Sequence, residues 1–179
     1  MKKLVLAYSG GLDTSYCAKY LSEEKGFEVH AVSINTGGFS QEEIDEIESK
    51  ALKIGAKTYK NIQAVDRFYD KVVKNLIYGN VLKNNTYPLS VSAERFDMIF
   101  QTLAPEIEII TPIRDLQLSR QAEIDYLKSH GVEMAWEKAK YSVNRGLWGT
   151  SVGGSETLTS HQGLPESAFP SQVEKTESE

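Results

Sequence analysis

The chain has 179 residues, of which 40% are hydrophobic and 25% charged, and its formal net charge is −5. These values are typical of a soluble globular domain, and no apolar run is long enough to span a bilayer. Acidic and basic residues are mixed without a basic stripe, and there is a single cysteine, Cys17. We therefore expect a cytoplasmic protein with no nucleic-acid or membrane partner and no internal disulfide.

The first elements in chain order form a strand–helix–strand unit. Lys3–Tyr8 contains a continuous apolar run, which is typical of a buried parallel strand. Apolar residues then recur at helical spacing from Leu12 until the chain reaches Gly26. Phe27–Ile34 is rich in β-branched and aromatic residues, so a second strand is predicted there.

The same alternation continues after the second strand. Ser40 and Glu43 fit a capping box at the start of a helix predicted to end at Gly55. Lys57–Ile62 predicts a weaker third strand, and helical spacing returns over residues 65–79. Strands that alternate with helices indicate an α/β fold, in which a parallel sheet is joined by crossover helices.

The second half of the chain carries weaker signals. Ile107–Thr111 predicts another short strand, and Gln121–His130 predicts a helix with Ile124 and Leu127 turned inward. From Leu147 onward the periodicity fades into glycine, serine, threonine and proline. We therefore expect an irregular tail after this point.

A polar segment, SGGLDTS, links the first strand to the first helix. In α/β sheets, ligands bind beyond the carboxyl ends of the strands, and a helix N-terminus attracts anions. Gly10 and Gly11 allow a ligand to approach the backbone closely, while Ser9, Thr14 and Ser15 supply hydroxyl donors. Asp13 would repel a phosphate unless a divalent cation lay between them, so Mg²⁺ bound by Asp13 is the natural inference.

Other interpretations of this loop fit the sequence less well. A P-loop needs a lysine after its glycines, and the dinucleotide fingerprint needs a third glycine at a spacing absent here. A plain helix entry would place Asp13 or Thr14 in the first turn, where the helix dipole favours an acid. The position and density of polar groups favour an anion cradle over that simpler alternative.

Taken with later segments, the loop resembles the pyrophosphate-binding loop of the N-type ATP pyrophosphatases, and most closely that of the argininosuccinate synthase family. The matching segments follow the family's order along nearly the whole chain: LVLAYSGGLDTS, KALKIGA, YPLSVSAER, ITPIRD, EIDYLKSHG and YSVNRGLWGTSVGG. The loop alone identifies only the superfamily, whereas the whole set is highly specific. The resemblance implies an adenine-nucleotide α-hydrolase-like, Rossmann-like domain followed by the start of a synthetase domain.

The resemblance also implies an activity. Members of the family ligate citrulline to aspartate in arginine biosynthesis, converting ATP to AMP and pyrophosphate through a citrullyl-adenylate, and they form homotetramers. By residue match, ATP would be bound by Ala7, Tyr8, Ser9, Gly10, Gly11, Leu12, Asp13, Thr14, Ser15 and, at the adenine, the backbone of Ile34. Citrulline would be bound by Tyr87, Ser92, Arg95, Ser142 and Ser151.

The chain departs from the family pattern at the Arg95–Phe96 junction. The family segment that holds aspartate is missing there, and Arg95 could belong to either flank. Either the printed sequence omits residues present in the polypeptide, or the polypeptide has lost them. Both flanks keep full family character, which favours omission and predicts Cα atoms farther apart than the ~3.8 Å of a peptide link. We divide the chain into an ATP-binding domain over 1–115 and the start of a synthetase domain over 116–179.

Two other functions remain open from sequence alone. The chain could be another ATP pyrophosphatase, although a tRNA-thiolating enzyme usually needs more than the single Cys17 and a basic surface. A true internal deletion would instead make it an inactive ATP-binding remnant. The three histidines lack zinc-ligand spacing. Cys17 is expected in the core, as are Trp136 and Trp148.

Overall fold

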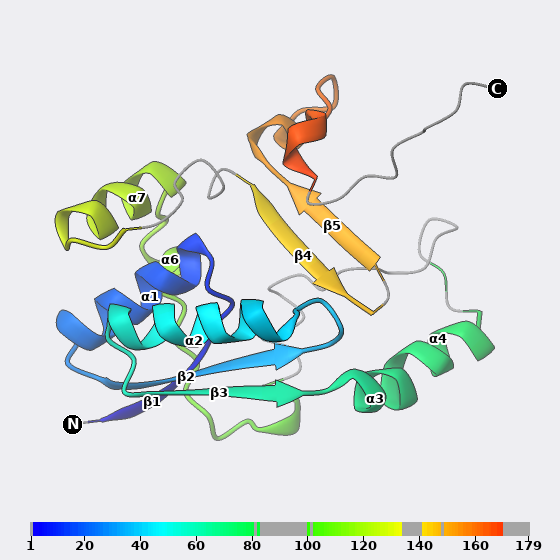
Figure 1. Cartoon of the computed structure of the whole chain (residues 1–179), viewed down its shortest axis with the longest axis horizontal. Helices are drawn as coiled ribbons and strands as arrows, with labels where there is room; N and C mark the ends of the chain where they lie inside the picture. Colours follow the sequence, from blue (N-terminus) through cyan, green and yellow to red (C-terminus); the bar gives the residue numbers. More distant parts are fainter. Residues whose placement is uncertain are drawn as a thin grey trace.

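The computed structural model describes residues 2–80, 82, 100, 102–133, 141–147 and 149–169. Three parallel strands form its main sheet in the order β1 (Lys3–Ala7), β2 (Glu28–Asn35) and β3 (Thr58–Gln63). Helices α1 (Leu12–Glu23) and α2 (Gln41–Ile54) cross over on the same face of this sheet (Figure 1). The predicted α/β architecture with crossover helices is confirmed.

The start and end of α2 follow from its sequence. The Ser40 hydroxyl accepts a hydrogen bond from the Glu43 N–H at 3.3 Å, and the Glu43 carboxylate accepts one from the Ser40 N–H at 2.9 Å. This reciprocal pair satisfies two N–H groups that the first helical turn leaves unpaired. At the other end, Gly55 has a φ of 127°, a conformation that side chains disfavour. The predicted capping box and glycine stop are both confirmed.

The segment after β3 is helical, as predicted, but not one regular helix. It consists of α3 (Val65–Phe68), a π-helical turn η1 (Tyr69–Val73) and α4 (Lys74–Tyr78). This run extends away from the sheet instead of lying across it (Figure 1).

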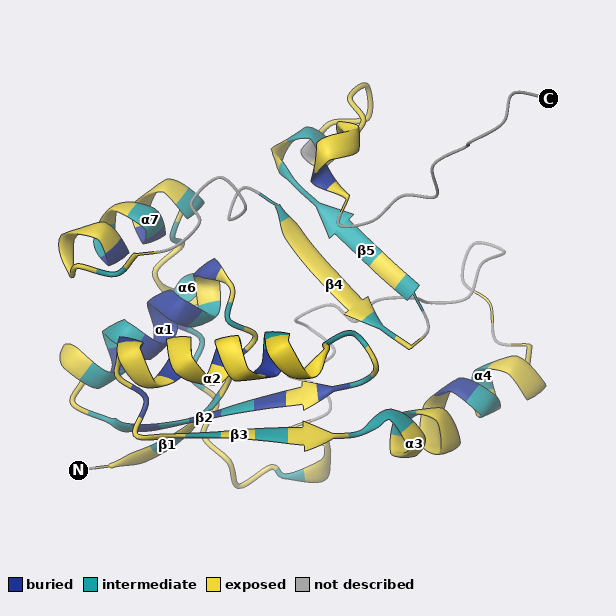
Figure 2. Cartoon of the chain, viewed as in Figure 1, coloured by how far each residue is buried: buried dark blue, intermediate teal, exposed yellow. Residues whose placement is uncertain are grey.

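Burial alternates along the strands because only one face of the sheet is covered by α1 and α2. Val29 and Ala31 are each 1% exposed beneath the helices. On the opposite face, Val5, Ile34 and Ile62 are 73%, 57% and 42% exposed (Figure 2). Among the described residues β1 pairs only with β2, so the expectation of a fully buried first strand is wrong at Val5.

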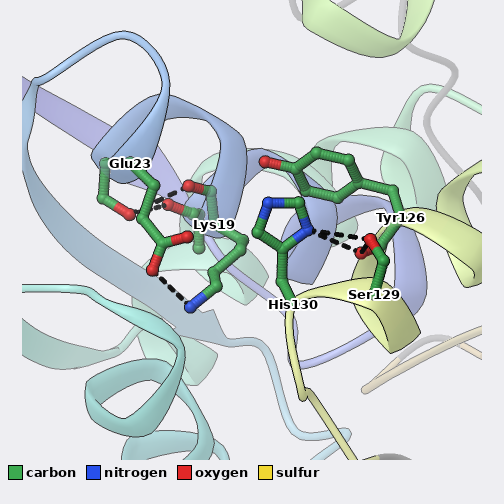
Figure 3. A network of polar contacts seen from close by, with 7 residues as sticks. Lys19, Glu23, Tyr126, Ser129 and His130 are labelled. Carbon is green, nitrogen blue, oxygen red and sulfur yellow. Dashed lines mark hydrogen bonds and ion pairs between the residues drawn. The ribbon is translucent and has the colours of Figure 1, made fainter.

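Helix α7 (Arg120–Ser129) packs against α1, after the short helix α6 (Pro112–Asp115). Leu127 of α7 has no exposed surface and belongs to the same hydrophobic core as α1. The Tyr126 ring lies 4.7 Å from that of Tyr16 and 4.1 Å from that of His130, centroid to centroid. Figure 3 shows Tyr126 and His130 facing α1 near the Lys19–Glu23 ion pair. The predicted helix at 121–130 is therefore confirmed.

The strand predicted at Ile107–Thr111 is not formed. These residues are irregular, with Ile107 and Ile109 exposed, and Pro112 directly afterwards begins α6. A strand exists only when a neighbour completes its hydrogen-bond ladder, and no described segment pairs with this one. The apolar pattern alone could not supply that neighbour.

The tail expected to be irregular contains a β-hairpin. Strands β4 (Ser142–Gly146) and β5 (Gly149–Gly153) pair antiparallel around a two-residue turn. Two single 3₁₀ turns follow, η3 (Ser155–Leu158) and η4 (Glu166–Ala168). The two connecting residues, Leu147 and Trp148, are not the glycine, asparagine or aspartate that usually mark a two-residue hairpin turn, so the sequence prediction missed the hairpin.

Several sequence predictions fall outside the described residues. They concern the citrulline-binding positions at Tyr87, Ser92 and Arg95, the separation across the Arg95–Phe96 junction, and the packing roles of Trp136 and Trp148. Within the described part of the chain, no helix has the length and apolar character needed to cross a bilayer.

Candidate functional site

The SGGLDTS loop lies at the carboxyl end of β1 and runs directly into α1. The sheet ladder holds its entry, because the Tyr8 N–H donates to the Val32 carbonyl at 2.9 Å. Gly10 has a φ of 76°, and Gly11 is the N-cap of α1 without a capping side chain. The N-cap residue therefore offers no side chain to the first N–H groups of α1, which can donate to a bound anion instead.

Gly10 is also required by packing. A Cβ atom built at this position would lie 3.1 Å from Cγ1 of Ile47, a buried residue of α2. The loop backbone thus passes close to α2 in a conformation that only glycine adopts without strain.

Weak hydrogen bonds join the exposed hydroxyls of the loop to one another. Thr14 Oγ1 lies 3.4 Å from both the N–H and the hydroxyl of Ser9, and it donates to the Gly11 carbonyl at 3.3 Å. All three contacts are longer than the usual 2.7–3.0 Å, so an incoming anion could replace them at little cost. The described geometry leaves Ser9 and Thr14 able to donate to a bound anion.

Ser15 occupies a different environment. Its side chain is fully buried, its hydroxyl lies 3.4 Å from that of Tyr8, and its N–H donates to the Gly11 carbonyl at 3.0 Å. Tyr8 is itself 2% exposed, and burial raises the pKa of its phenol. Together with the buried Leu12, these side chains support the loop from below.

Asp13 lies in the first turn of α1 and faces the start of α7. Its Oδ1 is 3.8 Å from Nη1 of Arg120, and its side chain is 55% exposed. Glu123, one turn further along α7, is 2% exposed, and its Oε2 has no hydrogen-bond partner among the described residues. Burial, reinforced by the Asp13 carboxylate and opposed by Arg120, raises the pKa of the Glu123 carboxyl to about 7. Sequence reasoning missed Arg120 and Glu123, because nothing local links α7 to the loop.

The second strand ends beside the loop region with Ile34 and Asn35. Ile34 is exposed on the open face, and its backbone pairs with Ile62. The buried Asn35 side chain accepts hydrogen bonds from the N–H groups of Gly37 at 2.9 Å and Phe39 at 3.3 Å. Asn35 therefore shapes the turn after β2, a role that sequence reasoning did not assign.

The hairpin docks on this same turn. The Leu147 N–H donates to the Thr36 carbonyl at 2.6 Å, and a Cβ atom at Gly38 would collide with the Arg145 carbonyl. Arg145 also forms an ion pair with Glu43. The pKa of the Glu43 carboxyl is lowered mainly by the hydrogen bond from the Ser40 N–H and further by Arg145. Figure 1 shows the hairpin tip beside the loop that joins β2 to α2.

The hairpin brings two predicted site residues onto one face. Ser142 pairs with Gly153, and Ser151 pairs with Asn144. Because paired and next-but-one residues point to the same side of a ladder, Ser142 and Ser151 share a face. Arg145, one position out of step, points to the opposite face.

Among the described residues, no group of three histidine, cysteine, aspartate or glutamate side chains could hold a metal ion. Asp13 and the adjacent hydroxyls nevertheless fit Mg²⁺, which is commonly held by one or two carboxylates together with substrate phosphates. A cavity of about 300 Å³ lined by Ser22, Gly55 and Lys57, among others, lies at the amino ends of the strands, away from this loop.

Comparison with known proteins identifies relatives of the chain. The family model described as "Arginosuccinate synthase N-terminal HUP domain" matches residues 3–95 and 92–133. The argininosuccinate synthase of Methanocaldococcus jannaschii is 37% identical over 184 residues, covering 85% of this chain and 46% of the relative. That of Sulfurisphaera tokodaii is 30% identical over 199 residues, covering 93% of this chain and 50% of the relative.

A solved structure is also similar. It is described as a predicted subunit of tRNA methyltransferase from Methanocaldococcus jannaschii. It has a TM-score of 0.41 and 18% identity, covering 86% of this chain and 97% of that one. A similarity this low carries no argument about function.

The comparisons also bear on the Arg95–Phe96 junction. The family model matches in two segments that meet at residues 92–95, immediately before it. The alignment with the Methanocaldococcus jannaschii relative spans 184 positions, more than the 179 residues of this chain, of which it covers only 85%. The relative therefore contains residues that have no counterpart here.

Proposed function

Since the chain belongs to the argininosuccinate synthase family, we propose that it is the ATP-binding part of a ligase that joins citrulline to aspartate. The chain spans about half the length of the curated relatives it matches. The ligase activity, its substrates and its assembly are accordingly proposals about the whole protein. We also propose the division near residue 115, the cytoplasmic location and the homotetramer.

The observation that carries this proposal is the conformation of the SGGLDTS loop. The positive φ of Gly10 and the bare N-cap at Gly11 leave backbone N–H groups at the helix end, where an anion is favoured. The pyrophosphate of ATP would contact Ser9, Gly10, Gly11 and Thr14, and Ala7, at the end of β1, would also contact ATP. Ile34, at the end of the neighbouring strand, would contact adenine through its backbone. Tyr8, Leu12 and Ser15 would support this site from the core.

Mg²⁺ is proposed as the partner of the nucleotide. Asp13 is half-exposed in the first turn of α1 and would hold the cation against the phosphates. When bound, the cation would neutralise charge on the leaving pyrophosphate. The loop N–H groups and hydroxyls would stabilise the same charge through fixed donors.

The proposed reaction has two steps. The ureido oxygen of citrulline attacks the α-phosphate of ATP, and pyrophosphate leaves, giving a citrullyl-adenylate. The aspartate amine then displaces AMP and forms the new carbon–nitrogen bond. Ser142 and Ser151 share the hairpin face proposed for citrulline, and Tyr87, Ser92 and Arg95 remain proposed ligands of that substrate. The residues that would hold aspartate are absent from the printed sequence.

Two measurements on the purified protein test this proposal. Isothermal titration calorimetry should detect binding of ATP and of pyrophosphate in the presence of Mg²⁺. Citrulline alone should then release at most one equivalent of pyrophosphate, and continued release should require both citrulline and aspartate. Release without either amino acid would favour another ATP pyrophosphatase activity, and failure to bind ATP would reject the assignment of the loop.

A second candidate function is an ATP-binding remnant without turnover. The division of the family match at residues 92–95 favours it, provided that the polypeptide really lacks the intervening segment. The intact mass of the isolated protein distinguishes the two cases. A mass equal to that of the printed sequence, with ATP binding but no pyrophosphate release, would establish the remnant.

A further inference from the structure

Arg120 supplies a positive charge to the loop from a distant part of the chain. Its Nη1 lies 3.8 Å from Asp13 Oδ1, where the start of α7 meets the first turn of α1. The two side chains are 42% and 55% exposed, so each can also reach solvent and solutes. This ion pair links α7 directly to the proposed phosphate site.

Helix α7 is held firmly enough to place this charge. The Ser119 hydroxyl accepts from the Ala122 N–H at 3.2 Å and caps the helix immediately before Arg120. Further along, Leu127 is completely buried and the Tyr126 ring packs 4.7 Å from that of Tyr16 on α1. Figure 3 shows the contact between α7 and α1 around Tyr126, whose ring faces α1.

A phosphate bound beside Asp13 needs a positive charge to offset the carboxylate. Asp13 would repel a phosphate bound at the neighbouring N–H groups, and the buried Glu123 carboxyl interacts electrostatically with Asp13. We propose that Arg120 is the resident counter-ion of Asp13 and enables the loop to bind a pyrophosphoryl group in the absence of a divalent cation. This inference rests on the proposed function, because it assumes that the loop binds pyrophosphate.

Arg120 and Mg²⁺ would then neutralise the same carboxylate. Because both would relieve the repulsion between Asp13 and the bound phosphate, their contributions to binding should not be additive. The effect of removing Arg120 on binding should therefore depend on whether Mg²⁺ is present. A residue that merely stabilised the fold would affect binding equally in both conditions. Arg120 is therefore a positioning and counter-ion residue, not a catalytic one.

The experiment measures binding of inorganic pyrophosphate by calorimetry, in EDTA and in excess MgCl₂. The wild type is compared with Arg120→Gln, with the conservative Arg120→Lys and with Gln121→Ala, a control on the exposed surface of the same helix. Arg120→Gln should weaken binding about tenfold in EDTA and less than about threefold in MgCl₂. Arg120→Lys should restore most of the loss, and Gln121→Ala should behave as the wild type in both conditions.

Other outcomes are equally clear. An equal loss in the two conditions, or no loss in either, would overturn the inference while the wild type still binds and the proposed function stands. In an Asp13→Asn background the Arg120→Gln effect should disappear. If it persists there at full size, Arg120 acts on the anion itself and the inference is wrong. Binding by the wild type in MgCl₂ but not in EDTA would overturn the inference and leave the proposed function standing. Failure of the wild type to bind pyrophosphate in both conditions would instead reject the proposed function, and the inference with it.

Discussion

At the scale of single residues, Gly10 meets two independent requirements. Its φ of 76° is disfavoured for residues with a side chain, and a methyl group there would press on Ile47. Gly10→Ala should therefore displace the loop and weaken pyrophosphate binding at least about tenfold, since the anion depends on aligned N–H groups. Calorimetry with pyrophosphate and MgCl₂ measures the effect.

Gly26→Ala is the matched control for this change. Gly26 has a similar φ of 65°, but a Cβ atom there would meet no atom of the described part of the chain within 4 Å. Both variants should lose about 1 kcal/mol of unfolding free energy through backbone strain, while only Gly10→Ala loses binding. Wild-type affinity in Gly10→Ala would show that the loop does not hold the anion.

Glu123 predicts a pH dependence of stability. Its pKa in the folded protein is about 7, above the ordinary 4.5, so between these values the folded protein holds a proton that the unfolded chain has lost. Its contribution to the free energy of unfolding therefore falls as the pH rises through this interval and is constant above it. The total change should be on the order of 3 kcal/mol.

Urea unfolding of the wild type and Glu123→Gln, in EDTA at about pH 5 and pH 8, measures this contribution. The wild type should lose stability between the lower and the higher pH, and Glu123→Gln should lack this loss. The free energy of unfolding of the variant minus that of the wild type should therefore be larger at the higher pH. Glu46→Gln, a change at an exposed carboxyl on α2, should leave the wild-type pH dependence in place. A difference between wild type and Glu123→Gln that stays constant with pH would contradict the prediction.

At the scale of elements, α2 depends on its capping box. Ser40→Ala removes the hydroxyl that accepts from the Glu43 N–H, and it should lower the unfolding free energy by about 1 kcal/mol. Ser40→Thr keeps an acceptor at the same position and should be close to wild type. Urea denaturation followed by circular dichroism measures both variants, and equal stability of Ala and Thr would mean that the cap contributes nothing.

At the scale of the whole molecule, α7 and the β1–α1–β2 unit share one core. Leu127→Ala removes a side chain with no exposed surface and should cost about 2–5 kcal/mol of unfolding free energy. Because that core is continuous, amide exchange in α7 and in β2 should be accelerated together. Acceleration confined to α7 would show that the helix unfolds separately, and Gln121→Ala should change neither region.

The sequence by itself determined the features that depend on neighbours in the chain. Strands β1 to β3, the capped helix α2 and the glycine-rich loop all follow from local propensity and periodicity. The family was also recognisable from sequence, because its segments keep their order along the chain. The prediction at Ile107–Thr111 failed for the complementary reason, since a strand requires a partner that local pattern cannot supply.

Only the tertiary structure decided which distant residues meet. It brought Arg120 to Asp13, left Glu123 buried beside them, and docked the hairpin at Leu147 on the turn after β2. It also showed that Ser15, alike in sequence to the other loop hydroxyls, is turned into the core towards Tyr8. Contacts of this kind depend on how helices and strands pack, and residue type and spacing along one chain do not specify that packing.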